Sequence, residues 1–286
     1  MDEATRQRMI ALVDASPATN LHVIDLPYRL CSPSATVADN VRLWEGADGS
    51  LLAWAVWQQP WITLDYAVHP DEAGTIETEI IAWTLDRFRA MAREHGRVLS
   101  YFIDAREDDP ARIALLERHG FVRADWCALH LTRTLETPLP WPSLPEGFTI
   151  RHLAGAEDLQ GYVALHRIAF ESTSMTAEWK TGITRMPQYI PDLDLVAVTP
   201  DGRFAAFCVS WLHGDAGQIE PLGVHSDFAG QGLGRTLLAE AFRRLQKRGV
   251  ATAHIEVSND NPRARHLDES AGFRAAHRIW KYERKV

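Results

Sequence analysis

Apolar positions in the second half of the chain follow two spacings, and the switch between them predicts the order of strands and helices. The segments Arg203 to His213 and Gly217 to His225 are rich in apolar and β-branched residues, which predicts two adjacent strands. Apolar residues then recur at helical spacing from Leu237 to Leu245, and Gly249 ends that helix. A strand over 251–258, a short helix over 262–271 and a final strand over 275–282 complete the pattern. Strands that alternate with helices predict an α/β domain with a mixed sheet.

The first half of the chain repeats short motifs of the second half in the same order. Residues 68–74 match residues 224–230 at an offset of 156 positions, and residues 119–123 match residues 271–274 at an offset of 152. Two copies of one domain explain this better than a solenoid of many repeats. Because His225 is repeated as His69, we expect it to have a local structural role.

A proline-rich segment lies between the two copies. Four prolines fall within the eight residues from Pro138 to Pro145, which removes backbone donors and favours extended polyproline geometry. The sequence therefore predicts a first domain over residues 1–135, a linker over 136–148 and a second domain over 149–286.

Composition narrows the class of protein. With 286 residues, 46% of them hydrophobic and 24% charged, the chain has the composition of an ordinary folded protein, and no apolar run approaches the roughly 20 residues of a membrane helix. Cys31, Cys127 and Cys208 are too few and too far apart for a disulfide framework or a zinc site, so we expect a cytoplasmic protein without a metal. Cys208 lies in an apolar strand and is expected in the core.

Charge is unevenly distributed along the chain. The net charge of -8 argues against a general nucleic-acid binder. Residues 219–286 nevertheless carry 12 basic and 8 acidic side chains, whereas residues 1–218 carry 18 and 30. An anionic cofactor bound near the C-terminus would favour this distribution, and a chance excess of charge on a solvated face is the alternative.

A glycine-rich turn provides the strongest chemical signal. Gly230, Gly232 and Gly234 stand between a predicted strand and an amphipathic helix, where successive N–H groups form a concavity suited to phosphate. A Walker loop is excluded because no Lys-Ser/Thr pair follows the glycines. The dinucleotide fingerprint fails because Arg235 stands where a small residue is needed.

Four signatures in the same order identify a resemblance. Residues 219–225, the turn ending Gly232-Leu233-Gly234, residues 261–264 and Ala271-Gly272-Phe273 together resemble the GNAT superfamily of acyl-CoA-dependent N-acyltransferases. The resemblance covers most of residues 150–286, and the two-copy arrangement is similar to that of tandem, mycothiol synthase-like members. It implies two tandem GNAT-like α/β domains, each a mixed, mostly antiparallel sheet flanked by helices.

The resemblance also implies where coenzyme A binds. The backbone of Leu222, Gly223 and Val224 would pair with the pantetheine arm, and a bulge near Pro221 would separate this strand from its neighbour. The N–H of Leu222 would polarise the thioester carbonyl. Asn261 would cap the short helix and reach the coenzyme arm, or serve as a plain helix cap. The pyrophosphate would lie against Gln231, Gly232, Leu233, Gly234, Arg235 and Thr236.

Glu220 is the candidate general base. Acyl transfer needs a neutral amine, so a base or a water relay must remove a proton from the ammonium form. Glu220 lies two residues before Leu222, and regular alternation would place both side chains on one face. Many superfamily members place their acid two positions earlier, where this chain has Gln218. A structural carboxylate is the alternative interpretation of Glu220.

Two further positions depart from the superfamily pattern. Asp268 occupies the slot in which a tyrosine commonly protonates the leaving thiolate. Asp268 could attract a cationic substrate, which we favour, or burial could raise its pKa, or water could protonate the thiolate; a solvated helix acid is the structural alternative. Ala229 stands where Arg or Gln is usual, which could reduce affinity for the coenzyme.

The first copy lacks the glycine turn. Ile76 and Thr78 replace the two glycines, and Glu77 and Glu79 add negative charge, so we expect no coenzyme there. In the second copy, the acceptor is expected near residues 159–179, with Tyr162, Glu171, Ser172, Ser174, Glu178 and Trp179 as candidates.

These observations predict an acetyl-CoA-dependent N-acetyltransferase that acts on a small amine, with no nucleic-acid or membrane partner, as a monomer or homodimer. A non-catalytic acyl-CoA-binding sensor or scaffold is the alternative, which Gln218, Ala229 and the missing tyrosine favour.

Overall fold

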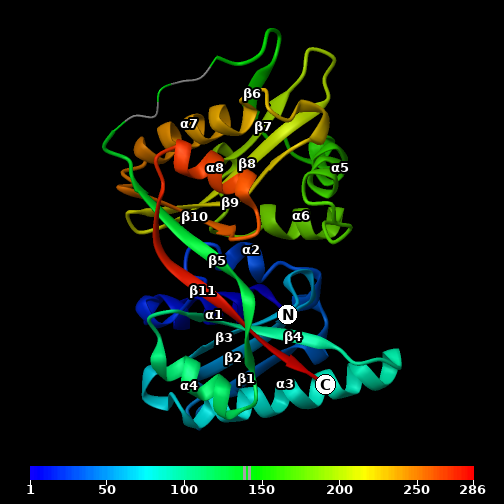
Figure 1. Ribbon diagram of the computed structural model, residues 1–286, viewed down its shortest axis with the longest axis vertical. Helices are drawn as coiled ribbons and strands as arrows, with labels where there is room; N and C mark the ends of the chain where they lie inside the picture. Colours follow the sequence, from blue (N-terminus) through cyan, green and yellow to red (C-terminus); the bar gives the residue numbers. More distant parts are fainter. Residues whose placement is uncertain (138–139, 141–142) are drawn as a thin grey trace. The chain divides into compact units, whose positions relative to one another are not determined.

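The chain divides into two units, and the first of them also contains the C-terminal segment of the sequence (Figure 1). The computed structural model describes residues 1–137, 140 and 143–286. The first unit comprises Met1–Ala128 with His277–Val286, and the second comprises Leu129–Ala276. The last ten residues therefore lie in the first unit and not, as the sequence suggested, with the second domain. Residues 138, 139, 141 and 142 of the predicted linker lie outside the described residues.

The first unit contains a mixed sheet with the strand order β1-β2-β3-β4-β11-β5. Its C-terminal strand pairs antiparallel with β4 over seven residue pairs, from Ile279↔Arg106 to Lys285↔Ser100, which is why the end of the chain belongs to this unit. Its elements are α1 (Glu3–Asp14), α2 (Leu26–Arg29), β1 (Val41–Glu45), β2 (Leu51–Gln58), β3 (Thr63–Val68), α3 (Thr75–His95), β4 (Ser100–Arg106) and α4 (Pro110–Arg118), with parts of β5 (Val122–Thr134) and β11 (Arg274–Lys285).

The second unit contains a mixed sheet with the strand order β5-β10-β9-β8-β7-β6. The pairs β6–β7, β7–β8 and β8–β9 are antiparallel, and β9–β10 is parallel. The α/β fold predicted from the sequence is confirmed. The elements are β6 (Thr149–His152), α5 (Leu159–Ala169), α6 (Ala177–Thr184), β7 (Asp194–Val198), β8 (Phe204–His213), β9 (Ala216–Val224), α7 (Leu233–Gln246), β10 (Thr252–Ser258) and α8 (Pro262–Ser270).

Helix α7 forms where the apolar spacing predicts it. Leu237, Leu238 and Leu245 are fully buried on one side of the helix. Gly232 caps the N-terminus with φ 81°, a left-handed conformation that glycine adopts without strain. The helix ends at Gln246, and Gly249 with φ 81° turns the chain toward β10.

The two copies share a histidine-capped turn at the end of a central strand. His69 Nδ1 accepts the N–H of Asp71 at 3.3 Å, and His225 Nδ1 accepts the N–H of Asp227 at 3.1 Å. Each histidine opens a short 3-10 turn, Pro70–Glu72 in one copy and Ser226–Phe228 in the other. The expected structural role of His225 is confirmed.

Two further expectations concern cysteines and membranes. All three cysteines are buried thiols outside any disulfide, and Cys208 is completely buried, as expected. Burial raises the pKa of the Cys208 thiol, which makes it a poor nucleophile. Among the helices of the described residues, none has both the length and the apolar character that crossing a membrane requires.

Candidate functional site

Strands β9 and β10 separate partway along their length. Their parallel pairing runs from Ala216↔Thr252 to Ile219↔Ile255 and stops there, although β9 continues to Val224 and β10 to Ser258. On the other side of β9, Ser210 pairs with Ile219 and Cys208 pairs with Leu222, so β9 carries one extra residue between these pairs. The bulge and the separation from the neighbouring strand that the sequence predicted are both confirmed.

The bulge changes which residues of β9 share a face. Gly217 faces α7, because a Cβ there would lie 3.0 Å from Leu245. Val224 also faces α7, since its Cγ2 lies 3.5 Å from the Cβ position of Gly234. Leu222, two residues before Val224, therefore faces α7 as well. Glu220 follows Ile219, which shares the α7 face with Gly217, and so Glu220 points toward α5 and α6. Placing Glu220 and Leu222 on one face by simple alternation was wrong.

The glycine turn offers open space at the start of α7. Gly230 and Gly232 have φ of 80° and 81°, and no heavy atom lies within 4 Å of a Cβ built on either. The first N–H groups of a helix have no acceptor within the helix and are directed out of its N-terminus. Gly234 has a different role, because its Cβ position lies 2.9 Å from Leu267 Cδ2 and lets α8 approach closely.

Several residues that were predicted to contact the coenzyme have side chains that are hydrogen-bonded to other residues of the protein. Thr236 Oγ1 donates to Gly232 O at 3.1 Å, and the Arg235 guanidinium donates to Ser270 O at 2.9 Å. Asn261 caps α8 by accepting the Ala264 N–H at 3.0 Å. The backbone N–H groups of Thr236 and Asn261 are also bonded, to Gly232 O and Ser258 O, each at 3.0 Å. The donors left for a ligand at the turn are therefore the backbone N–H groups that precede Thr236.

Asp268 is a buried acid. Its exposed fraction is 3%, so it is not the solvated helix residue that was considered from the sequence. Burial raises the pKa of its carboxyl to about 7, and the nearby charge of Glu269 acts in the same direction. Of the three explanations open at the sequence level, the structure favours burial. An acid with this pKa is partly protonated at neutral pH and can donate a proton.

A cluster that the sequence did not predict lies beside Gln218. His130 of β5 bonds through Nδ1 to Glu256 Oε1 at 3.2 Å and through Nε2 to His254 Nδ1 at 2.9 Å. Both partners belong to β10, more than 120 positions away along the chain. The alternation of His254 and Glu256 on one strand face was a signal, but nothing local to His130 indicated its place in the cluster.

The acceptor candidates separate into core and surface residues. Tyr162 is completely buried and Trp179 is 3% exposed, so both belong to the core and not to an open acceptor surface. Glu171 and Glu178 are exposed. Ser172 and Ser174 are half-buried and hydrogen-bonded to each other at 2.8 Å.

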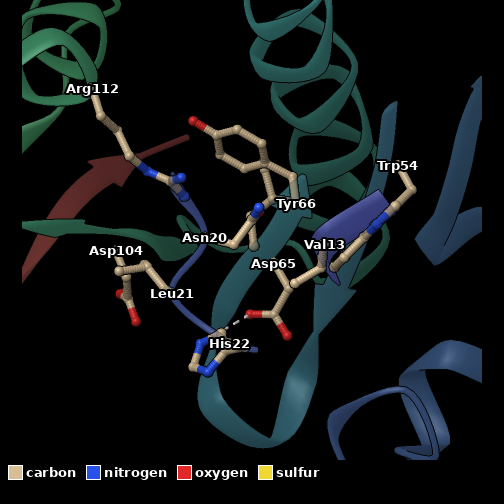
Figure 2. A pocket seen from close by; sticks show the side chains of 10 residues that line it. Val13, Asn20, Leu21, His22, Trp54, Asp65, Tyr66, Asp104 and Arg112 are labelled. Atoms are coloured by element: carbon tan, nitrogen blue, oxygen red, sulfur yellow. Dashed lines mark ion pairs between the residues drawn. The ribbon is translucent and has the colours of Figure 1, made fainter. Parts of the chain in front are cut away.

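The corresponding gap in the first unit is filled by polar side chains. Strands β3 and β4 pair at Thr63↔Phe102 and Leu64↔Ile103 only. Figure 2 shows the space beyond, where Asp65, Tyr66 and Asp104 from the strands meet Arg112 and His22 around a cavity of ≈ 10 Å³, about the volume that one water needs.

Ion pairs and a helix cap hold this first-unit cluster closed. The Asp65 carboxylate accepts two hydrogen bonds from Arg29, one from Nε and one from Nη2, each at 2.7 Å. Arg112 lies over the Tyr66 ring at 4.1 Å. Glu77 Oε2 accepts the Gly74 N–H at 3.0 Å, which places a carboxylate at the start of α3. This carboxylate places negative charge at the start of α3, which would repel a phosphate there.

Comparison with known proteins points to one family. Residues 157–273 match the model of the Acetyltransferase (GNAT) family, and this region contains β9, the glycine turn, α7, β10 and α8. The chain is 33% identical over 174 residues to a mycothiol acetyltransferase of Kineococcus radiotolerans, which covers 59% of this chain and 57% of that protein. It is 29% identical over 227 residues to a mycothiol acetyltransferase of Frankia casuarinae, which covers 73% of this chain and 64% of that protein. Each match spans less than two thirds of the relative.

Solved structures resemble the whole chain in fold. A tandem GNAT protein from the clavulanic acid biosynthesis pathway aligns over 99% of this chain and 95% of its own, with a TM-score of 0.68 and 16% identity. A GCN5-related N-acetyltransferase from Sphaerobacter thermophilus aligns over 86% and 81%, with a TM-score of 0.65 and 24% identity. These likenesses establish two tandem domains of the same fold.

Proposed function

Because residues 157–273 form a domain of the GNAT acetyltransferase family, we propose that the protein is an acetyl-CoA-dependent N-acetyltransferase that acts on a small amine. The observation that carries the proposal is the coincidence of the separated β9–β10 pair with an open glycine turn at the start of α7. Both fall inside the matched region. From the relatives named mycothiol acetyltransferase we extend only acetyl transfer to this chain, because the matches span part of their length.

The residues around the turn fit a pyrophosphate. Successive amides from Gln231 to Arg235 would provide the donors, and the absence of side chains at Gly230 and Gly232 lets an anion approach them. The Thr236 N–H donates to Gly232 O at 3.0 Å within the helix, so it is not among these donors. The backbone of Leu222 to Val224 lies along the gap opened by the bulge and would hold the extended arm of the coenzyme. Acetyl-CoA would supply an activated acetyl group there. Neither Arg235 nor Thr236 is needed as a side-chain ligand.

Three groups of the chain would act on the reactants. The N–H of Leu222, beside the bulge, would donate to the thioester carbonyl oxygen. Glu220, on the face toward α5 and α6, would stabilise the ammonium form of the acceptor or take its proton. Asp268, whose pKa is raised to about 7 by burial, would hold the proton that the departing thiolate needs.

Glu220→Gln is expected to lower kcat/KM for the amine by about 100-fold at neutral pH, because an anionic partner of the ammonium group is lost. Release of free thiol from acetyl-CoA across a panel of primary amines gives the rate, and calorimetry gives the affinity for the coenzyme. Affinity for acetyl-CoA should stay within about twofold. Glu157→Gln, a change at an exposed carboxylate of the same unit, is the matched control and should leave both unchanged.

The same panel separates an enzyme from a sensor. Tight binding of acetyl-CoA without turnover of any amine would contradict the catalytic proposal and favour an acyl-CoA-binding sensor. Gln218, where many superfamily members have an acid, is the specific residue that keeps this second possibility open.

A further inference from the structure

Three polar side chains form a continuous hydrogen-bond chain across two strands of the second unit. Glu256 Oε1 contacts His130 Nδ1 at 3.2 Å, and His130 Nε2 contacts His254 Nδ1 at 2.9 Å. The side chains of His130 and Glu256 are 14% and 19% exposed, so the hydrogen bond between the carboxylate and the imidazole is largely shielded from bulk water.

This connectivity determines which nitrogen carries each proton. An ionised carboxylate only accepts hydrogen bonds, so His130 must carry its proton on Nδ1. The Nε2 of a neutral His130 is then an acceptor, and His254 must donate to it from Nδ1. A neutral His254 with its proton on Nδ1 has its lone pair on Nε2. Glu256 thus sets the tautomer of both histidines.

The histidine pair lies next to the position where an acid was expected. His254 is the register partner of Gln218 across the parallel β9–β10 pair, so the two side chains share one face. Gln218 itself pairs with Trp211, and Trp211 shares its face with Phe207, which stacks on His166 of α5. This is the face toward which Glu220 points. The strands separate one residue beyond His254, at Ile255.

We propose that His254 is the general base that removes a proton from the amine, with His130 and Glu256 as positioning residues. The proposal rests on the proposed acetyltransferase function. The ammonium form of the acceptor gives one proton to His254 Nε2 and becomes the neutral nucleophile. The proton on His254 Nδ1 moves to His130 Nε2, so that the positive charge comes to rest on His130 beside the Glu256 carboxylate. The acceptor thus loses one proton, the histidine pair gains one, and His254 is neutral again at the end of the step.

Other charged groups on the same face have separate roles. Glu220 on β9 is the nearest carboxylate in sequence to Gln218 and would neutralise the incoming ammonium. Asp194 on β7 is bonded to Lys180 of α6 at 2.5 Å, so this ion pair is already balanced. Burial and the charge of Lys180 lower the pKa of His166 to about 4, which keeps His166 neutral near pH 7.

Histidine tautomers can be measured without any turnover. Long-range ¹H–¹⁵N correlation spectra of the ¹⁵N-labelled full chain at neutral pH should show His130 and His254 with the proton on Nδ1. The variants His130→Gln and His254→Gln assign the signals among the 12 histidines. In Glu256→Leu, both residues should lose the Nδ1-protonated form. A neutral His254 with its proton on Nε2 in the wild-type chain would overturn the proposal.

Kinetics test the catalytic role. His254→Gln should lower kcat by about 100-fold or more at neutral pH, and the loss should shrink toward pH 10, where the free amine no longer needs a base. Glu256→Gln should move the acidic limb of the kcat profile to lower pH, because the imidazolium loses its anionic neighbour. Adding Gln218→Glu to His254→Gln should restore much of the rate by placing a carboxylate at the register partner. His152→Gln, at an exposed histidine of β6, is the matched control.

The outcomes separate this proposal from the proposed function. If Glu220→Gln abolishes kcat while His254→Gln leaves it within about twofold, Glu220 is the base and the proposal is overturned. If the wild-type chain shows the expected tautomers, binds acetyl-CoA and turns over no amine, the proposed function fails, and the role of His254 as base fails with it. If amines are acetylated and His254 carries its proton on Nε2, only the present proposal fails.

Discussion

Replacing Lys180 with methionine is expected to lower the free energy of unfolding of the second unit by about 3–5 kcal/mol, because it leaves a buried carboxylate without its cation. Lys180 and Asp194 are both completely buried, and Lys180 Nζ lies 2.5 Å from Asp194 Oδ2. Tyr189 donates to the same oxygen at 2.8 Å, and the ammonium group lies 3.7 Å from the centre of the Tyr162 ring. The ion pair therefore connects α6 to β7.

The double variant Lys180→Met/Asp194→Leu serves as the control. Removing both charges leaves no uncompensated ion, so most of the lost stability should return. Hydrogen exchange of the amides of α6 and β7 measures the free energy of unfolding of the second unit separately from that of the first. A loss below about 1 kcal/mol in Lys180→Met would mean that Asp194 does not depend on the ion pair.

Asp268→Asn is expected to remove a large pH dependence of stability in the second unit. The folded state keeps the Asp268 proton up to about pH 7, whereas an unfolded chain releases it near the ordinary aspartate pKa of 3.8. Between these values the folded state binds the extra proton, so stability falls as pH rises through this window. The full loss above pH 7 is on the order of 4 kcal/mol as an upper limit.

The variant should therefore match the wild type near pH 4 and exceed it in stability at pH 8. Urea unfolding at both pH values measures this difference, and Asp260→Asn, at an exposed acid before α8, should change neither value. An identical pH dependence in Asp268→Asn and the wild type would show that burial does not raise the pKa of Asp268.

Local patterns were sufficient to predict the elements that carry the candidate site. The apolar spacing located α7, and the glycines predicted a turn whose backbone needs positive φ at Gly230 and Gly232. The repeat of His69 at His225 predicted a shared structural role, because each imidazole caps its own short turn. These features depend on neighbours within a few positions, which the sequence displays directly.

Features that depend on distant neighbours could not be predicted in this way. One extra residue in β9 reverses the relation between Glu220 and Leu222, and only the pairing with β8 reveals it. The burial of Asp268 depends on how α8 packs, and His130 meets its partners through strand order. The final strand, β11, pairs with β4 of the first unit. The boundary between the units therefore differs from the one that the repeated sequence motifs predicted.

The measurement that tests the central claim most directly is a calorimetric titration of coenzyme A into the wild type, Gln231→Glu and Gln231→Arg. Gln231 is exposed at the glycine turn, so neither change should disturb folding. If the amides that follow Ala229 hold the pyrophosphate, one site per chain is expected. Gln231→Glu should then weaken binding about tenfold and Gln231→Arg should tighten it, with both effects shrinking at high salt. Equal affinity in all three proteins, or two sites per chain, would contradict this account.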